Sequence, residues 1–136
     1  MSASFSLETD RARDLVRIRM SGLFARADIA AFLEARARAH AELACAPNQH
    51  VTLNDLRGMK IQPQEAVAAF RLMLSDPAYR SRKLAFVISQ TLARSQLARA
   101  LNGRDHVHCF DDVGDAEAWL FAEDYMALPR RRAVGR

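Results

Sequence analysis

Residues 50–60 read His-Val-Thr-Leu-Asn-Asp-Leu-Arg-Gly-Met-Lys, and this stretch decides how the rest of the chain is interpreted. It begins as a strand of alternating apolar residues and reaches a carboxylate at Asp55. A glycine-containing turn then leads to Pro63, a residue that suits the first position of a helix. In open α/β domains, ligands bind where such a strand ends and leads into a helix. No motif for catalysis, phosphate binding or metal binding crosses the stretch, so it indicates a fold class without an activity.

Outward from this strand, short apolar strands alternate with amphipathic helices. The order β-β-α-β-α-β-α-β-α predicts a single α/β domain with a mixed five-stranded sheet. The third helix is expected to end at Asn102-Gly103, because glycine accepts the left-handed conformation that follows a last helical turn. The strands are expected at 5–8, 15–20, 50–55, 83–88 and 106–110, and the helices are expected to start near Asp28, at Pro63, at Ser89 or Thr91, and at Asp112 or Asp115.

The strands alternate in polarity, which predicts a sheet with helices mainly on one face. Right-handed crossovers between strands taken in sequence would place the helices there. The alternative is that one helix crosses to the other face and covers Ala85 and Val87. The covered face is expected to carry Val16, Ile18, Met20, Val51, Leu53, Leu84, Phe86, Ile88, Val107 and Cys109. The open face is expected to carry Arg17, Arg19, Thr52, Asn54, Lys83, Ala85, Val87, His106 and His108.

The first helix is expected to pack on the covered face through a stripe with three-to-four spacing. His40 falls on this stripe and is interpreted as a boundary residue. The stripe comprises Ile29, Phe32, Leu33, Ala37, His40, Ala41 and Ala44, and the solvent-facing side comprises Glu34, Arg36, Arg38 and Glu42.

Charge and length favour one neutral domain with a basic end. The chain has 136 residues and a formal charge of +4. Four arginines lie in residues 130–136, and without them the basic and acidic residues are equal at 16 each. We therefore expect a folded domain over residues 1–127 and a flexible basic tail over 128–136. Because the basic residues do not cluster on a folded face, nucleic-acid binding is not expected.

The cysteines and the hydrophobic segments favour a soluble cytoplasmic protein. Cys45 and Cys109 are far apart and not in a paired motif, and no signal peptide precedes them, which indicates a reducing compartment. Cys109 alternates in phase with Val107 and is expected in the core. The longest aliphatic strand, Leu84 to Ile88, is too short to span a bilayer, so no transmembrane segment is expected.

No catalytic residue, metal site or cofactor is predicted. His106 and His108 are two residues apart on a strand and would share a face, but a third zinc ligand at a characteristic spacing is missing. Asp55 could be a general base, yet a carboxylate at a strand end more often holds the loop through backbone N–H groups. The sequence contains neither a GxSxG elbow nor a P-loop.

The layout resembles the STAS superfamily, and within it the SpoIIAA-like branch of small bacterial proteins. The resemblance rests on the element order, on Leu53-Asn54-Asp55-Leu56-Arg57 at the end of the third strand, and on Ala116-Glu117-Ala118-Trp119-Leu120 in the last helix. It implies a non-enzymatic domain that binds a protein partner. The segment from Leu56 to Pro63, where relatives carry a phosphorylated serine, contains neither serine nor threonine, so this switch is expected to be absent. The branch also resembles the lipid-binding lobe of Sec14-type proteins.

These observations favour a regulatory protein–protein interaction module; the alternative is a carrier or sensor of a small apolar or anionic, lipid-like ligand. The loop from Leu56 to Gln62 is expected to contact the partner or ligand, since a helix start with free N–H groups follows two cations. The open sheet face is also available to a partner or to a second copy of the chain, as a homodimer. The predicted contact residues are Asp55, Arg57, Gly58, Lys60, Arg17, Arg19, Asn54, His106 and His108.

Overall fold

The computed structural model describes residues 2–89, 95 and 106–132, with side chains to residue 122. The expected third helix, which starts at Ser89 or Thr91 and ends at Asn102-Gly103, lies outside these residues apart from its first position and residue 95. The last helix continues past residue 127, the expected end of the domain. The elements are β1 Ser4–Asp10, β2 Leu15–Gly22, α1 Arg26–Ala41, β3 Val51–Met59, α2 Gln64–Leu74, the 3-10 helix η1 Pro77–Tyr79, β4 Lys83–Val87, β5 Val107–Phe110 and α4 Val113–Arg132.

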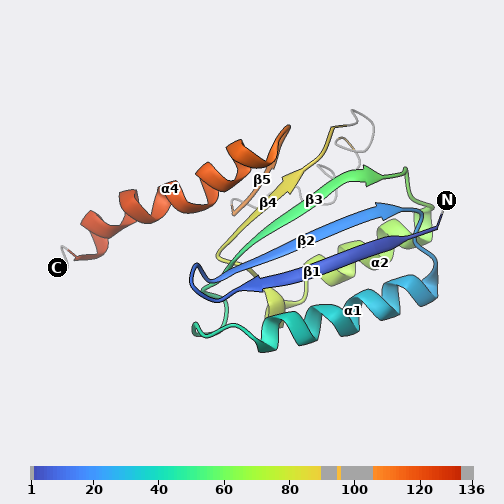
Figure 1. The fold of residues 1–136 in the computed structure, drawn as a ribbon, viewed down its shortest axis with the longest axis horizontal. Coiled ribbons are helices and arrows are strands. Elements are labelled where there is room, and N and C mark those ends of the chain that lie inside the picture. The colour runs from blue at the N-terminus through green and yellow to red at the C-terminus, as the bar shows by residue number, and fades with distance from the viewer. Residues whose placement is uncertain (1, 90–94, 96–105, 133–136) are drawn as a thin grey trace.

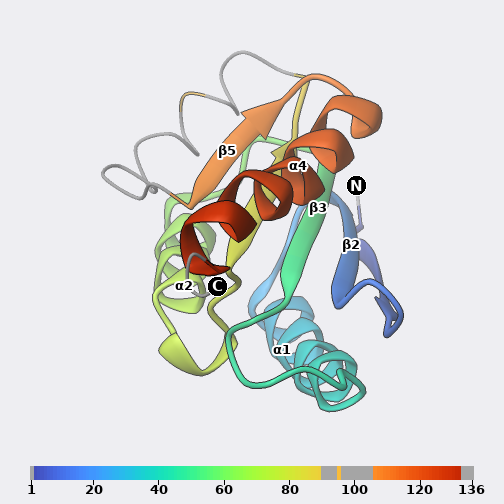
Figure 2. The ribbon, with the colours of Figure 1, turned by 90° about the vertical axis from the view of Figure 1, so that its left-hand side faces the viewer.

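The five strands form one mixed sheet in the order β1-β2-β3-β4-β5, which confirms the predicted fold class (Figure 1). β1 is antiparallel to β2, and the other neighbours are parallel. Helices α1 and α2 lie on one face of the sheet and α4 lies on the other (Figures 1 and 2). None of the helices, in the part of the chain that the structure describes, has the length and hydropathy needed to cross a membrane.

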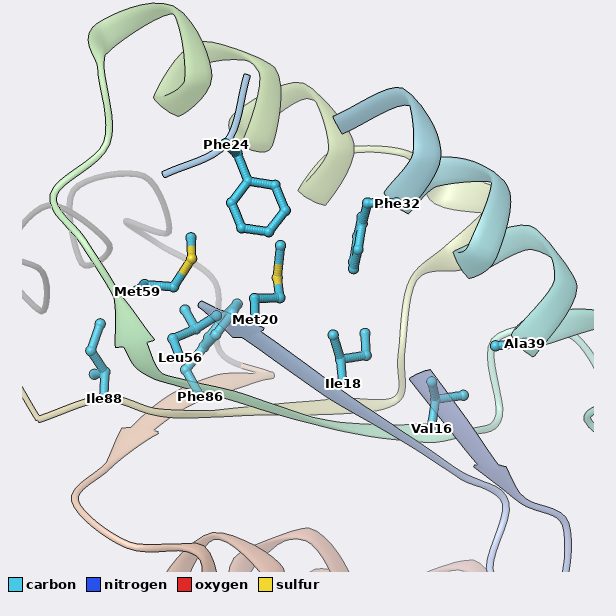
Figure 3. Close-up of a cluster of buried hydrophobic side chains, with 10 residues drawn as sticks. All are labelled: Val16, Ile18, Met20, Phe24, Phe32, Ala39, Leu56, Met59, Phe86 and Ile88. Carbon is cyan, nitrogen blue, oxygen red and sulfur yellow. The ribbon is translucent and has the colours of Figure 1, made fainter. Parts of the chain in front are cut away.

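Each face of the sheet has its own apolar core. Under α1 and α2, the strand side chains point toward the helices, as Figure 3 shows for Val16, Ile18, Met20, Leu56 and Phe86. Under α4, the core consists of Leu15, Val51, Leu53, Ala85, Val87, Ala116 and Leu120. A helix therefore does cross to the second face and covers Ala85 and Val87, which is the alternative that the sequence left open.

The predicted orientation of β3 is wrong. Val16 pairs with Thr52 and Ile18 pairs with Asn54, so Thr52 and Asn54 face α1 and α2. Val51 and Leu53 belong instead to the core under α4. The sequence pattern misleads here because every residue from 51 to 56 is buried. When both faces of a strand are covered, polarity no longer tells which face a side chain occupies.

β3 also continues past the predicted strand end at Asp55, so the first four residues of the expected loop, 56–59, are strand. Gly58 pairs with Ser21 after a register shift between β2 and β3. A Cβ atom on Gly58 would lie 2.7 Å from the Ser21 Cβ, which explains the need for glycine where the two strands approach closely. Gln62 then anchors the segment before α2, because its side chain accepts the Phe24 backbone N–H at 2.9 Å and donates to the Gly22 carbonyl at 2.8 Å.

Helix α1 begins at Arg26, and the Asp28 carboxylate accepts the backbone N–H of Ala25 at 2.8 Å. The buried residues of the helix are Phe32, Arg36 and Ala39. The prediction that Arg36 faces solvent is therefore wrong, and Leu33, which was expected on the buried stripe, is 37% exposed. The buried stripe runs through positions 32, 36 and 39, which is the three-to-four spacing of an amphipathic helix. Its central residue, Arg36, is charged.

Candidate ligand-binding cavities

Two adjoining cavities lie on the α1/α2 side of the sheet. The apolar cavity has a volume of about 90 Å³ and lies between α2 and the strand residues Met20, Leu56, Met59 and Phe86, whose side chains are drawn in Figure 3. The polar cavity has a volume of about 60 Å³ and lies between α1, η1 and the sheet. Its polar wall consists of Arg36, His40, Thr52, Asn54, Asp76, Tyr79, Arg80, Ser81 and His106. Asn54, Met73 and Leu74 line both cavities, so these side chains form the partition between them.

Arg36 is the central charge of the polar cavity. Only 9% of its surface is exposed. One guanidinium nitrogen, Nη1, donates to the Met73 carbonyl at 3.2 Å, and the other, Nη2, lies 3.6 Å from the Asp76 carboxylate. The guanidinium carbon lies 4.1 Å from the centre of the Tyr79 ring. Burial lowers the pKa of Arg36 while Asp76 opposes this effect, and an arginine stays protonated under such conditions.

Two buried polar atoms at these cavities have no hydrogen-bond partner among the described residues: Arg36 Nε and Asn54 Oδ1. Leaving a buried polar group unpaired costs about 1–3 kcal/mol, and more when the group is charged. Because native proteins pair nearly all such groups, an unpaired one calls for an explanation. One unpaired group is a donor, the other is an acceptor, and both belong to residues that line the polar cavity.

A chain of hydrogen bonds runs along the wall of the polar cavity. The Ser81 hydroxyl lies 2.6 Å from the Thr52 hydroxyl and 3.2 Å from His50 Nε2. Burial lowers the pKa of His50 to about 4; repulsion from His40 in its protonated form and from Arg82 adds to this effect, and Asp14 opposes it. A serine beside a histidine can form a nucleophile and a base. An imidazole with so low a pKa is a weak base at neutral pH, so this pair is better suited to orienting the Ser81 hydroxyl.

His40 joins the same wall from α1. Its Nδ1 lies 2.8 Å from the Arg36 carbonyl. Its ring meets the His50 ring edge-on at 4.8 Å and the Tyr79 ring at 5.0 Å. Burial lowers the pKa of His40, and the Arg36 charge adds to this effect. Both histidines are therefore neutral near pH 7, and the charged groups of the cavity wall are Arg36, Arg80 and Asp76.

The predicted contact residues at the end of β3 gather on the opposite face of the sheet. Arg57 binds the Asp55 carboxylate through two side-chain bonds of 3.0 and 2.8 Å, and this contact lowers the pKa of Asp55. The same carboxylate accepts the backbone N–H of Arg57 at 3.1 Å, which is the holding role expected of Asp55. Arg19 lies 3.9 Å away, and Arg17 forms an ion pair with Glu117 of α4.

The remaining predicted residues are divided between the two faces. Asn54 and His106 line the polar cavity, whereas Lys60 lies at the apolar one. The prediction that His106 and His108 share a face is wrong, because His106 is a turn residue that precedes β5. His108 packs against Trp119 of α4, with ring centres 4.7 Å apart. Within the described residues, no group of three or more histidine, cysteine or acidic side chains is arranged to hold a metal ion.

Sequence reasoning missed Arg36, Ser81, Asp76 and Tyr79 as members of a site. For Arg36 a signal existed, since it stands four residues after Phe32 and four before His40, both of which were assigned to the buried stripe. The charge of Arg36 predicts a solvent-facing side chain, whereas its position in the helical repeat predicts a buried one. The other three residues, Asp76, Tyr79 and Ser81, lie just before, in and just after η1, where no periodicity marks a buried side chain.

Comparison with known proteins supports the fold. No family model and no curated protein matches the sequence. Among the solved structures that are similar to this chain is one with a TM-score of 0.68 and 15% sequence identity, over 88% of this chain and 96% of the other. It is an uncharacterised protein from Shewanella loihica PV-4, of the DUF3478 family, with a SpoIIAA-like fold. The chain described here therefore has a SpoIIAA-like fold, as its element order predicted.

Proposed function

We propose that this protein is a non-enzymatic binding domain that holds a small ligand in the two cavities on the α1/α2 side of the sheet. The observation that carries the proposal is the pair of unpartnered polar atoms, Arg36 Nε and Asn54 Oδ1, beside an apolar space. A ligand that supplied the missing partners would offset the cost of burying these atoms. This favours the carrier or sensor function over the regulatory interaction that the sequence placed first.

The chemistry of the wall supports binding over catalysis. The low pKa of His50, about 4, disfavours general-base activation of Ser81. Ligand sites are mostly apolar, with a few polar groups that fix orientation. The combination of methionine, leucine and phenylalanine side chains around the apolar cavity with one buried arginine matches that description.

The test is native mass spectrometry of freshly purified protein, compared with the denatured mass. We expect an adduct of a few hundred daltons at most, lost on denaturation. Met73→Trp would place a larger side chain between the two cavities and take up the space for the ligand, so it should abolish the adduct. Leu72→Trp is the matched control, because Leu72 is the neighbouring residue on α2 and is 76% exposed. A protein that carries no adduct, and whose Met20, Met59 and Met73 methyl signals do not shift when hexan-1-ol is added, would contradict the proposal.

A second candidate function, binding of a regulatory protein partner, is favoured by the part of the sheet that α4 leaves open. Two hollows of about 640 and 280 Å³ lie over β1 to β3 on that face. Arg19, Asp55 and Arg57 line both, and the side chains of Arg19 and Arg57 are 74% and 42% exposed. Exposed arginines in such a position suit an acidic surface on a partner.

The double substitution of Arg19 and Arg57 by alanine tests this candidate by pull-down, with Arg38→Ala on the exposed side of α1 as control. Loss of a captured protein only in the double variant would support it, and equal capture would remove the face from consideration. We also expect no phosphorylation between Leu56 and Pro63, because this segment lacks a hydroxyl side chain. Intact mass after incubation with kinase and ATP checks this expectation.

A further inference from the structure

We infer that the ligand is a small organic acid: a monocarboxylate of about six carbon atoms in total, with a hydrogen-bond donor on the carbon next to the carboxylate. This inference rests on the proposed function and adds the chemical class of the ligand. It is carried by the unpaired donor on Arg36, the unpaired acceptor on Asn54, and the size of the space beside them.

The carboxylate is assigned to Arg36. The residue is 9% exposed, and its charge is only partly balanced, because the Asp76 carboxylate is 3.6 Å from Nη2 and 40% exposed. Two other groups contact the guanidinium without balancing its charge: the Met73 carbonyl accepts a hydrogen bond from Nη1, and the Tyr79 ring packs against the guanidinium carbon. Nε remains available, and a carboxylate is the acceptor that arginine binds best. Arg80 on the same wall adds positive charge, which favours an anion over a neutral ligand.

The donor is assigned to Asn54. This residue is 8% exposed and its Oδ1 is unpaired, so it can accept a hydrogen bond but cannot donate through that atom. A carboxylate alone would leave it unsatisfied. A hydroxyl or amino group on the carbon next to the carboxylate would point toward the partition that Asn54 forms between the two cavities, and would supply the missing proton.

The size of the ligand is limited by volume. The two cavities measure about 90 and 60 Å³. An engineered apolar cavity of about 150 Å³ binds one benzene molecule. The two cavities together therefore suit a whole ligand of about six carbons and are too small for a long acyl chain. The surrounding methionines, Met20, Met59 and Met73, are flexible and adapt to the shape of such a ligand.

The test is a calorimetric titration of the full-length protein with three probes of similar length: hexan-1-ol, hexanoate and 2-hydroxyhexanoate. Hexanoate is expected to bind at least about tenfold more tightly than hexan-1-ol, which corresponds to one charge-assisted hydrogen bond. 2-Hydroxyhexanoate is expected to bind several-fold more tightly again. The acid-over-alcohol preference should disappear in Arg36→Gln, return in part in Arg36→Lys, and persist in Arg38→Gln. The preference for the hydroxy acid should disappear in Asn54→Ala, which removes the acceptor without filling the cavities.

The outcomes distinguish the chemical class of the ligand from the ligand-binding function itself. If the wild-type protein binds acid and alcohol equally, the carboxylate is overturned while the cavity function stands. Equal binding of hexanoate and its hydroxy derivative overturns the role of Asn54. If none of the three probes binds and native mass spectrometry shows no adduct, the proposed function fails.

Should Arg36→Gln not fold, the wild-type protein alone decides the question through [1-13C]hexanoate. Bound beside Arg36, its carboxyl signal should keep the position of the ionised form to lower pH than the free acid does. A bound signal that titrates together with the free acid contradicts the contact.

Discussion

The two faces of this sheet are packed in different ways. Under α4, six side chains have no exposed surface at all: Leu15, Val51, Ala85, Val87, Ala116 and Leu120. Under α1 and α2, the core holds two cavities and both of the buried polar atoms that lack partners in the described chain. The difference indicates that one face serves mainly stability and the other keeps space for a ligand.

The residue types on each face account for the difference. Ala85 on β4 and Ala116 on α4 are small, so the helix approaches the sheet closely and the branched side chains around them interlock. On the other face, Met20, Met59 and Met73 line the apolar cavity, and flexible, unbranched methionines can adapt their shape to what lies beside them. A closed core and an adaptable one thus share a single sheet.

The largest expected effect comes from opening the closed face. Leu120→Ala should lower the free energy of unfolding by about 3–4 kcal/mol, because it creates a cavity where the surroundings are fully packed. Met73→Ala, beside an existing cavity and only half-buried, should cost about 1 kcal/mol. Urea unfolding of both variants measures the difference. Equal losses would mean that the two faces are packed alike.

A smaller loss is expected from acid. His50 stays neutral in the folded protein down to a pKa of about 4, whereas in the unfolded chain it takes up a proton below about pH 6.5. The unfolded state therefore binds more protons between these values, and stability falls as the pH drops through that window. The loss attributable to His50 from pH 7 to pH 4 should be on the order of 2–3 kcal/mol.

The comparison for this prediction is His50→Gln, which should show a shallower dependence of unfolding free energy on pH. His108→Gln is the control, because it removes an exposed histidine from the other face of the sheet. If His50→Gln and the wild-type protein lose stability in parallel, His50 is not the group that titrates.

The smallest expected effect is a gain in the free energy of unfolding. Asn54→Leu removes an unpaired buried carbonyl and fills part of both cavities, so it should raise the free energy of unfolding by about 1 kcal/mol. Asn48→Leu should do the opposite, because Asn48 has a φ of 66° and donates to the Pro77 and Arg80 carbonyls. Chemical denaturation compares the two. A destabilised Asn54→Leu would show that Oδ1 is paired in solution.

Much of this architecture can be predicted from the sequence, since alternating strands and helix starts such as Asp28 and Pro63 carry local signals. The orientation of β3 could not be predicted, because a strand covered on both faces has no polar side to identify. The same limit applies to α4, whose position over Ala85 and Val87 was one of two arrangements compatible with the pattern. The unpaired atoms of Arg36 and Asn54 are a property of three-dimensional contacts, and no spacing of residues encodes them.

The order of the strands has a consequence for how the chain folds. Because the spatial order β1-β2-β3-β4-β5 is the order of synthesis, each new strand joins the edge that the previous one has just formed. No strand has to enter between two that are already paired, so the sheet can grow from its N-terminal hairpin in one direction. Contacts between elements close in sequence favour fast folding. The growing edge is exposed until β5 and α4 are made, and a nascent chain that stalls after β4 would present that edge to other chains.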